Sequence, residues 1–560
     1  MTHILKPPCD EGVILSKATS KLTGASPAEA TPEDATNSAG SQAALAPRGA
    51  VEVPRARTHP SNIGLWVLVT TILGSSMAFI DGTVVNVALP VLQKELAVTV
   101  GDAQWVVEAY SLFLASLILV GGSLGDSFGR KRIFALGIVL FTVASVLCGL
   151  SPNVSLLIIA RAIQGIGGAL LVPGSLAIIS ASFDSEERGR AIGTWSGFTA
   201  ITSVIGPVLG GVLVQYASWR WVFFINVPLA AIVLFVLFWR VPESRDTEDN
   251  PGLDWVGALL ATLGLGGLVY GLIEAGNLGL GAPTVLSALT VGIIALVVFV
   301  IVEARSPSPM VPLSLFRSRT FSGANLLTLL LYAALGGTLF FVPFNLISVQ
   351  GYSPSAAGAA MLPMILILFL LSRWSGGLIN RYGAKLPLTI GPCIAALGFA
   401  LFALPDIGGS YWTTFFPASV VLGLGMAISV APLTTAVMGA VDAQRAGTAS
   451  GINNAVARTA GLLAIAVLGI IVLVVFNVSL DSHLATLNIS DQVLQSINAQ
   501  RFKLVGIQIP IGGTTGLLLK QAIQEAFVAG FRAATLTGAG LALAAALSSW
   551  LLIDGKKPDK

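Results

Sequence analysis

Charged residues are scarce in this sequence: they make up 11% of 560 residues, whereas a soluble globular chain carries about 25%. So few charges could not cover the surface of a soluble protein of this length. Apolar residues account for 54% of the chain, and its mean hydropathy is +0.84. This balance excludes a soluble enzyme, a disordered protein and a nucleic-acid binder. The net charge of +3 is too small to indicate a charged partner.

Cysteine and histidine are nearly absent. The three cysteines imply no disulfide framework, and no Cys/His cluster has the spacing of a metal site, so no metal is predicted. The three histidines, His3, His59 and His483, all lie outside the apolar runs. Proton chemistry inside a membrane would therefore have to use carboxylates.

Two further motifs are missing. There is no Walker-type Gly-rich Lys motif, which excludes ATP hydrolysis as an energy source. No nucleophile–base arrangement is visible, so we expect no enzyme activity and no cofactor. Coupling to an ion gradient is the energy source that remains.

Long apolar runs dominate what is present. A bilayer demands about 20 apolar residues per helix, and fourteen such runs follow one another. They predict an all-α integral membrane protein. The runs are 64–89, 105–124, 133–150, 156–179, 191–214, 221–239, 255–274, 283–302, 321–347, 355–373, 384–404, 412–437, 451–476 and 526–553.

The segments outside these runs set the predicted topology. Residues 1–62 are polar and predict a disordered tail, and residues 554–560 form a short second tail. Most Lys and Arg residues of the loops fall on one side, which predicts that both termini are cytoplasmic in a multi-pass protein of the plasma membrane, the inner membrane of a bacterium. The loop 477–525 is then external, with helical apolar spacing over 479–500 and 516–527.

An internal repeat indicates two related halves. The turn 122–132 (GSLGDSFGRKR) follows the second run, and a similar turn, 376–386 (GGLINRYGAKL), follows the tenth. Asp126 of the first turn corresponds to Asn380 of the second. A weak repeat between halves is typical of transporters. It predicts helices arranged 6+2+6: an N-terminal bundle over 63–240, two additional helices over 241–306 and a C-terminal bundle over 307–553 that includes the external loop.

The first copy of this turn is a predicted conformational gate at the cytoplasmic mouth. Its glycines permit a tight turn with positive φ, and the carboxylate can pair with a neighbouring helix end or arginine. Such a salt bridge would hold one conformation shut until transport breaks it. The predicted gate residues are Gly122, Asp126, Gly129, Arg130, Lys131 and Arg132.

Several motifs together resemble the major facilitator superfamily, and within it the fourteen-span drug:proton antiporter family. The turn 122–132 is similar to the superfamily's loop signature. The segments 78–90, 161–169 and 219–228, and Gly197 followed by 206–211, are similar to further signatures, each at the expected span. The resemblance covers residues 64–553 and implies a multidrug efflux protein conferring antibiotic resistance. It ties the fifth-span residues to antiport rather than symport: Gly197, Gly206, Pro207, Gly210 and Gly211.

Three charged residues inside spans are predicted to couple transport to protons or cations. Asp81 lies in the first span and Arg161 in the fourth, and either charge costs several kcal/mol in lipid unless it has a function or a partner. At roughly 1.5 Å per residue both fall in the outer half of the membrane, as does Glu108 near the start of the second span. The three could share one cavity, where Arg161 tunes the pKa of Asp81. A structural partner for a polar neighbour is the alternative role of Asp81, and Glu108 could equally be an interfacial carboxylate.

Polar amides inside the spans are candidates for the wall of a cargo cavity. These are Asn86, Gln164, Asn325 and Asn345. The glycines beside Gln164 are better explained by close helix packing.

The sequence thus predicts a proton-coupled secondary transporter that exports small amphipathic, cationic drugs by alternating access. Its partners would be the small-molecule substrate, protons and the lipid bilayer, with no nucleic acid; in a Gram-negative cell a periplasmic adaptor protein would join them. One alternative is an exporter of one specific metabolite or siderophore. Another, of a different class, is a non-transporting membrane receptor or scaffold.

Overall fold

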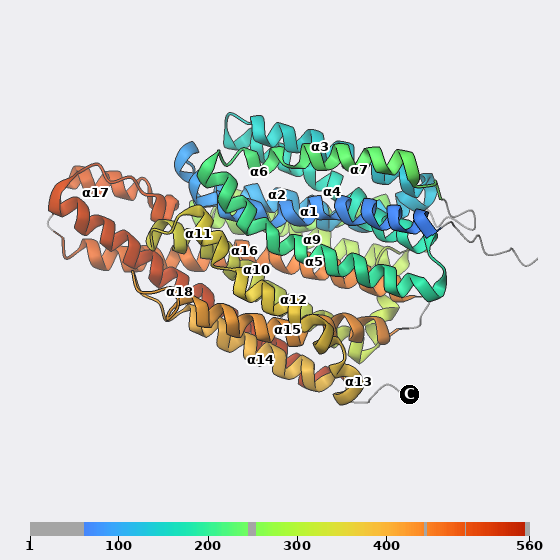
Figure 1. Cartoon of the computed structure of the whole chain (residues 1–560). Helices are drawn as coiled ribbons and strands as arrows, with labels where there is room; N and C mark the ends of the chain where they lie inside the picture. The colour runs from blue at the N-terminus through green and yellow to red at the C-terminus, as the bar shows by residue number, and fades with distance from the viewer. Residues whose placement is uncertain (1–60, 245–253, 308, 442–444, 488, 555–560) are drawn as a thin grey trace, which may run out of the picture. The chain divides into compact units, whose positions relative to one another are not determined.

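The computed structural model describes residues 61–244, 254–307, 309–441, 445–487 and 489–554. These residues fold into helices and the turns between them (Figure 1). Thirteen helices of the described chain are long and apolar enough to cross a membrane, and α5 adds a shorter apolar stretch, Ile205–Tyr216. The predicted all-α membrane fold is confirmed, and the predicted fourteen spans are compatible with this count. The tail predicted over 1–62 lies outside the described residues except for its last two, which begin α1.

The first half of the chain packs around α1 and α4. Helix α4 lies against α2 and α3, while α1 lies against α5 and α7. The sixth predicted span is broken at Ile225 into two helices. The helices are α1 (Ser61–Leu96), α2 (Val100–Phe128), α3 (Arg130–Leu150), α4 (Val154–Ser182), α5 (Ser185–Tyr216), α6 (Trp221–Phe224) and α7 (Asn226–Arg240).

Helices α8 (Trp255–Leu278) and α9 (Pro283–Arg305) form a separate pair. Their backbones touch through glycines: a methyl group on Gly267 would lie 2.8 Å from the Ala288 carbonyl oxygen. Helix α8 packs against α2 of the first half and α16 of the second. The outer face of α9 exposes Leu286, Val291 and Ile294, as lipid contact requires.

The second half contains six further membrane-length helices. Helix α10 packs against α16 and α18, and α14 against α15 and α18. The elements are η1 (Leu313–Arg317), α10 (Arg319–Phe344), the π-helical turn η2 (Asn345–Val349), α11 (Pro354–Ala359), α12 (Leu362–Gly376), α13 (Leu378–Tyr382), α14 (Lys385–Phe402), α15 (Phe415–Gly439), α16 (Ala446–Leu484), α17 (Asp491–Asn498), η4 (Arg501–Gly506) and α18 (Gly513–Leu552).

Much of the predicted loop 477–525 is helical. Helix α16 continues to Leu484 and α18 already begins at Gly513, so both run past the predicted spans because their pattern stays amphipathic beyond the apolar run. The residues between them, 485–512, are here called the cap segment, which contains α17 (Figure 1). The Gln93 amide of α1 donates to the Lys503 carbonyl oxygen at 3.0 Å. The cap segment therefore lies where α1 ends, and this end of the helices is called the cap end.

Candidate functional site

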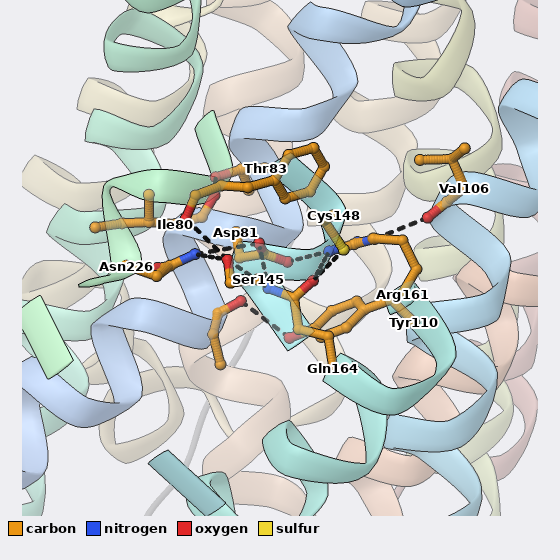
Figure 2. A network of polar contacts seen from close by, with 12 residues as sticks. Ile80, Asp81, Thr83, Val106, Tyr110, Ser145, Cys148, Arg161, Gln164 and Asn226 are labelled. Atoms are coloured by element: carbon orange, nitrogen blue, oxygen red, sulfur yellow. Dashed lines mark hydrogen bonds and ion pairs between the residues drawn. The ribbon is translucent and has the colours of Figure 1, made fainter. Parts of the chain in front are cut away.

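A network of buried polar side chains ties together the helices of the first half (Figure 2). Asp81 of α1 and Arg161 of α4 form an ion pair with exposed fractions of 0% and 1%. The Gln164 amide donates to the other Asp81 oxygen at 2.8 Å, and its carbonyl oxygen accepts from Arg161 at 2.8 Å. Arg161 also donates to the Val106 carbonyl oxygen at 2.9 Å and lies over the Tyr110 ring, 4.4 Å from its centre. Every charge in this cluster is therefore compensated from within the first half.

Two more helices join the network through short polar side chains. The Asn226 amide, at the start of α7, donates to the Ser145 hydroxyl at 2.9 Å and approaches Asp81 at 3.5 Å. The Ser145 hydroxyl of α3 donates in turn to the Phe223 carbonyl oxygen at 2.8 Å. The Asn226 carbonyl oxygen is buried with no hydrogen-bond partner in the described chain.

Glycines of α4 bring Arg161 and Gln164 to their partners. A methyl group on Gly165 would lie 2.4 Å from the Tyr110 carbonyl oxygen, and one on Gly167 would lie 2.6 Å from the Phe141 nitrogen. Since any larger residue would push α4 away from α2 and α3, these glycines allow the close helix contact that brings Arg161 and Gln164 within reach of their partners. The packing role that the sequence assigns to them matches this geometry.

Glu108 does not join Asp81 and Arg161. It is fully buried on α2, and both carboxyl oxygens lack a hydrogen-bond partner among the described residues. Its neighbours one turn away face the other half: the Gln104 amide donates to the Ile465 carbonyl oxygen of α16 at 2.9 Å. Residues two apart on a helix point in different directions, so Tyr110 reaches Arg161 and Glu108 does not. The predicted grouping of three charges thus becomes one pair and one separate acid.

The remaining cavity candidates lie in different places. Asn325 lines an apolar cavity of about 560 Å³ between α2, the α8–α9 pair, α10 and α16, and its side chain accepts from Asn453 at 3.1 Å. Asn345 is buried in η2 and accepts from the Gln350 amide at 3.2 Å. The Asn86 carbonyl oxygen is buried with no partner in the described chain. Only Gln164 of the four belongs to the charged network.

The turn predicted to be a gate is held by Glu243, which follows α7, the last helix of the first half. Gly129 has φ +106, as expected for a turn that only glycine adopts readily. Asp126 pairs with Arg130 at 2.7 Å. Glu243, beyond α7, accepts from the Lys131 backbone at 3.0 Å and approaches Arg132 at 3.6 Å. Gly122 is loosely packed, because a methyl group there would lie 3.7 Å from Pro173.

Replacing Asp126 with asparagine is expected to slow transport by roughly tenfold while cargo binding stays within a factor of about two. The Asp126–Arg130 pair is partly exposed, and such pairs contribute only about 0.3–0.5 kcal/mol to stability, so folding should be unaffected. Efflux rates and binding by tryptophan quenching check this. The matched change in the second repeat, Asn380→Ala, should slow transport less. An equal loss in both variants would contradict the expectation that the first copy of the turn, and not the second, acts as the gate.

Two of the fifth-span residues, Pro207 and Gly211, lie at the contact between the two halves. A methyl group on Gly211 would lie 2.4 Å from the Pro354 carbonyl oxygen of α11, and one on Gly358 of α11 would lie 2.1 Å from the Pro207 carbonyl oxygen. Gly206 and Gly210 instead face α1, with Thr83 and Val84 at 2.0 and 2.7 Å. A methyl group on Gly197 would meet no atom of the described residues within 4 Å. The predicted antiport residues thus divide into three groups. Gly211 and Pro207 pack against the other half, Gly206 and Gly210 pack against α1, and Gly197 packs against none of the described residues.

Sequence reasoning missed several members of the site. Tyr110, Ser145 and Asn226 hold the network together, and Glu243 holds the turn. Asn226 stands in the motif 219–228, where its polar side chain inside an apolar run is a detectable signal. Ser145 carries no such signal, because serines in membrane helices commonly bond to their own backbone.

A bundle of membrane-length helices, with a buried ion pair inside one half and backbone contact between halves, defines a polytopic membrane transporter. The family model described as Major Facilitator Superfamily matches residues 71–466. The chain belongs to this superfamily and is a transporter rather than an enzyme.

Similar proteins support this assignment. The multidrug resistance protein Stp of Mycobacterium tuberculosis is 34% identical over 501 residues, covering 87% of this chain and 91% of that protein. The methylenomycin A resistance protein of Bacillus subtilis is 36% identical over 416 residues, covering 74% and 88%. The inward-facing, unoccupied crystal structure of a bacterial homolog of the human lysosomal transporter Spinster has a TM-score of 0.63 at 17% identity, covering 90% of this chain and 100% of that one. The last likeness concerns the fold alone.

Proposed function

We propose that this chain exports small amphipathic drugs in exchange for protons, and thereby confers antibiotic resistance. The observation that carries the proposal is the fully buried Asp81–Arg161 pair. An acid and a base inside membrane helices are costly to keep without a function. The names of the similar proteins, which describe multidrug and methylenomycin A resistance, support drugs as the cargo.

Proton exchange follows from what protonation of Asp81 would change. A proton on this carboxyl removes one charge of the pair and leaves the Arg161 guanidinium bonded to Val106 and Gln164 but without a counter-charge. The first half then carries an uncompensated positive charge in low dielectric, which favours a different arrangement of its helices. Alternation of the protonated and unprotonated arrangements would expose the cavity to one side of the membrane and then to the other.

A growth-inhibition panel in an efflux-deficient bacterial host tests the drug-export function. Expression of the chain is expected to raise the inhibitory concentration of several chemically diverse compounds. Protection against one compound class only would support the alternative, an exporter of a single metabolite or siderophore. If the protein is present in the membrane and the host gains no resistance, the result would contradict drug export. It would then favour the alternative of a receptor or scaffold.

The proposed topology places both termini and the turn at Lys131 in the cytoplasm, and the cap segment outside. The basis is the excess of basic residues on the side of the turn. In a cysteine-free background, a membrane-impermeant maleimide added to intact cells should label Lys503→Cys and not Lys131→Cys. The opposite labelling pattern would invert the orientation and the direction of export with it.

The charge of the cargo stays a prediction from the sequence. The argument for a cationic cargo depends on Asp81 as a free acid. In this conformation Asp81 is paired with Arg161, so the pair offers a cation no net charge.

A further inference from the structure

A cavity of about 600 Å³ lies at the cap end, between α1 of the first half, η2, α11 and α18 of the second half, and the cap segment. Apolar side chains such as Val91 and Ile523 form most of its walls. Three lysines also line it: Lys94 of α1, Lys503 of the cap segment and Lys520 of α18. Among the described residues no carboxylate lines this cavity. Its volume suits a small organic ligand.

The charges of these three lysines are not balanced by acids of the chain. Neither an ion pair nor a hydrogen bond joins their ammonium groups to any residue that the structure describes. Like charges around one cavity repel each other, and an anion between them would relieve that repulsion. Acids at this end of the helices pair with other bases instead: Glu95 with Arg220 at 2.7 Å, Glu525 with His483 at 2.9 Å, and Asp481 with Arg501.

The backbone around the cavity is strained at two places. Within the described chain, Ala97 and Leu504 are the two residues other than glycine with positive φ, at +53 and +49. Ala97 lines the cavity, and Leu504 stands between Lys503 and Val505, which both line it. Such backbone conformations cost about 1–3 kcal/mol each and cluster at ligand sites, where the surrounding structure holds them in place. The strain is therefore a second sign that this cavity is a binding site.

The cavity also joins the two halves of the protein. Pro354 lines it, and the carbonyl oxygen of the same residue lies 2.4 Å from where a methyl group on Gly211 would be. On another wall, Gln93 of α1 donates to the Lys503 carbonyl oxygen at 3.0 Å. A ligand in this cavity would consequently contact the first half, the second half and the cap segment together.

We propose that this cavity binds an amphipathic organic anion, with its carboxylate or phosphate among the ammonium groups of Lys94, Lys503 and Lys520 and its apolar part against the walls. Ammonium groups bind such oxygens as compact point charges. Soluble acids and anionic lipids share this chemistry. The residues of the Asp81–Arg161 network do not line the cavity, so the inference goes beyond the proposed export function and does not depend on it.

Binding of matched probes to the purified full-length protein in phosphatidylcholine vesicles tests this inference. Energy transfer from the protein's tryptophans reports binding of pyrene-butyrate and of its methyl ester. The wild-type protein is expected to bind the acid at least about tenfold more tightly than the ester, and added salt should weaken binding of the acid alone. The triple variant Lys94→Gln, Lys503→Gln, Lys520→Gln should bind both equally. It should fold, because the Lys503 carbonyl oxygen, and not its side chain, accepts from Gln93.

A lipid arm and a control variant complete the experiment. Phosphatidylglycerol and phosphatidylcholine, each with a pyrene-labelled acyl chain, are compared in the same two proteins. A preference for the acid over its ester identifies a soluble acid as the ligand, and a preference for phosphatidylglycerol identifies a lipid, provided that the triple variant loses it. The control is Lys385→Gln, which follows α13 at the end of the helices away from α17 and should keep every preference (Figure 1).

Three results would overturn the inference. One is a wild-type protein that shows no preference for the anion in either arm. Another is a folded triple variant that keeps the wild-type preference. The third is a Lys385→Gln variant that loses the preference as fully as the triple variant, since the effect would then come from the overall charge of the protein and not from the cavity.

Discussion

Asp81→Asn is expected to abolish proton-driven efflux, with a loss of about two orders of magnitude or more. The carboxylate accepts from both Arg161 and Gln164. An asparagine amide cannot carry a proton away and leaves the buried Arg161 without a counter-charge, a change that costs about 3–5 kcal/mol in buried pairs. The assay is efflux of a fluorescent substrate from energised vesicles, with proton movement followed by a pH-sensitive dye. Asp81→Glu keeps the charge but displaces it by one methylene, so partial activity is expected.

A double variant separates coupling from folding. In Asp81→Asn with Arg161→Gln both charges of the pair are removed, so the buried cation is no longer unpaired and thermal stability should recover towards wild type. Proton-driven efflux should remain absent, because the protonatable group is gone. Efflux at the wild-type level in either Asp81→Asn variant would remove Asp81 from the mechanism and leave Glu108 as the acid to test.

The second large effect is expected for Gly211→Ala. The new methyl group would lie 2.4 Å from the Pro354 carbonyl oxygen, a distance at which α5 and α11 must separate. The Ser355 and Gln215 side chains, which hydrogen-bond between these helices, would separate with them. We expect a population shift towards a conformation open at the cap end and a loss of efflux of roughly tenfold or more, since a shift of about 1.4 kcal/mol changes an equilibrium tenfold.

Spin labels at the exposed residues Tyr216 and Leu404 of the two halves measure this shift, in a cysteine-free background. A longer label-to-label distance should gain population in Gly211→Ala. Gly197→Ala on the same helix is the matched control, because its methyl group meets nothing within 4 Å in the part of the chain that the structure describes, and alanine favours a helix by about 0.5–1 kcal/mol over glycine. Equal losses in both variants would show that the contact with α11 is not what matters.

The charged pair could be predicted from the sequence because membrane helices impose depth. The directions of the first and fourth runs place Asp81 and Arg161 at similar levels, and Gln164 follows one turn after Arg161 on the same face of α4. Rotation of the helices about their axes is not specified in this way. Ser145 and Asn226 enter the network only because α3 and α7 turn those faces inward. Glu108 stays outside it because it lies one turn from Gln104, on the face of α2 that contacts α16.

Packing distances were beyond the sequence for the same reason. Gly197 and Gly211 share one motif, yet an added methyl group meets nothing at the first and a backbone oxygen at the second. The contact partner of Gly211 lies in the other half, in a segment whose position no local pattern encodes. The predicted spans do not give the helix ends, because α16 and α18 both continue beyond their apolar runs. The length of an apolar run indicates where a helix crosses the membrane, whereas a helix ends where its backbone hydrogen bonds stop.

Purified wild-type protein in sealed vesicles tests the central claim, proton-coupled export, most directly. A compound that scores in the growth panel is loaded on one side, a pH gradient is imposed, and drug flux and proton flux are recorded together. The account predicts that drug moves only against an opposing flow of protons and that collapsing the gradient with a protonophore stops accumulation. Drug accumulation that persists without a pH gradient or membrane potential, or that proceeds with no proton movement, would contradict it.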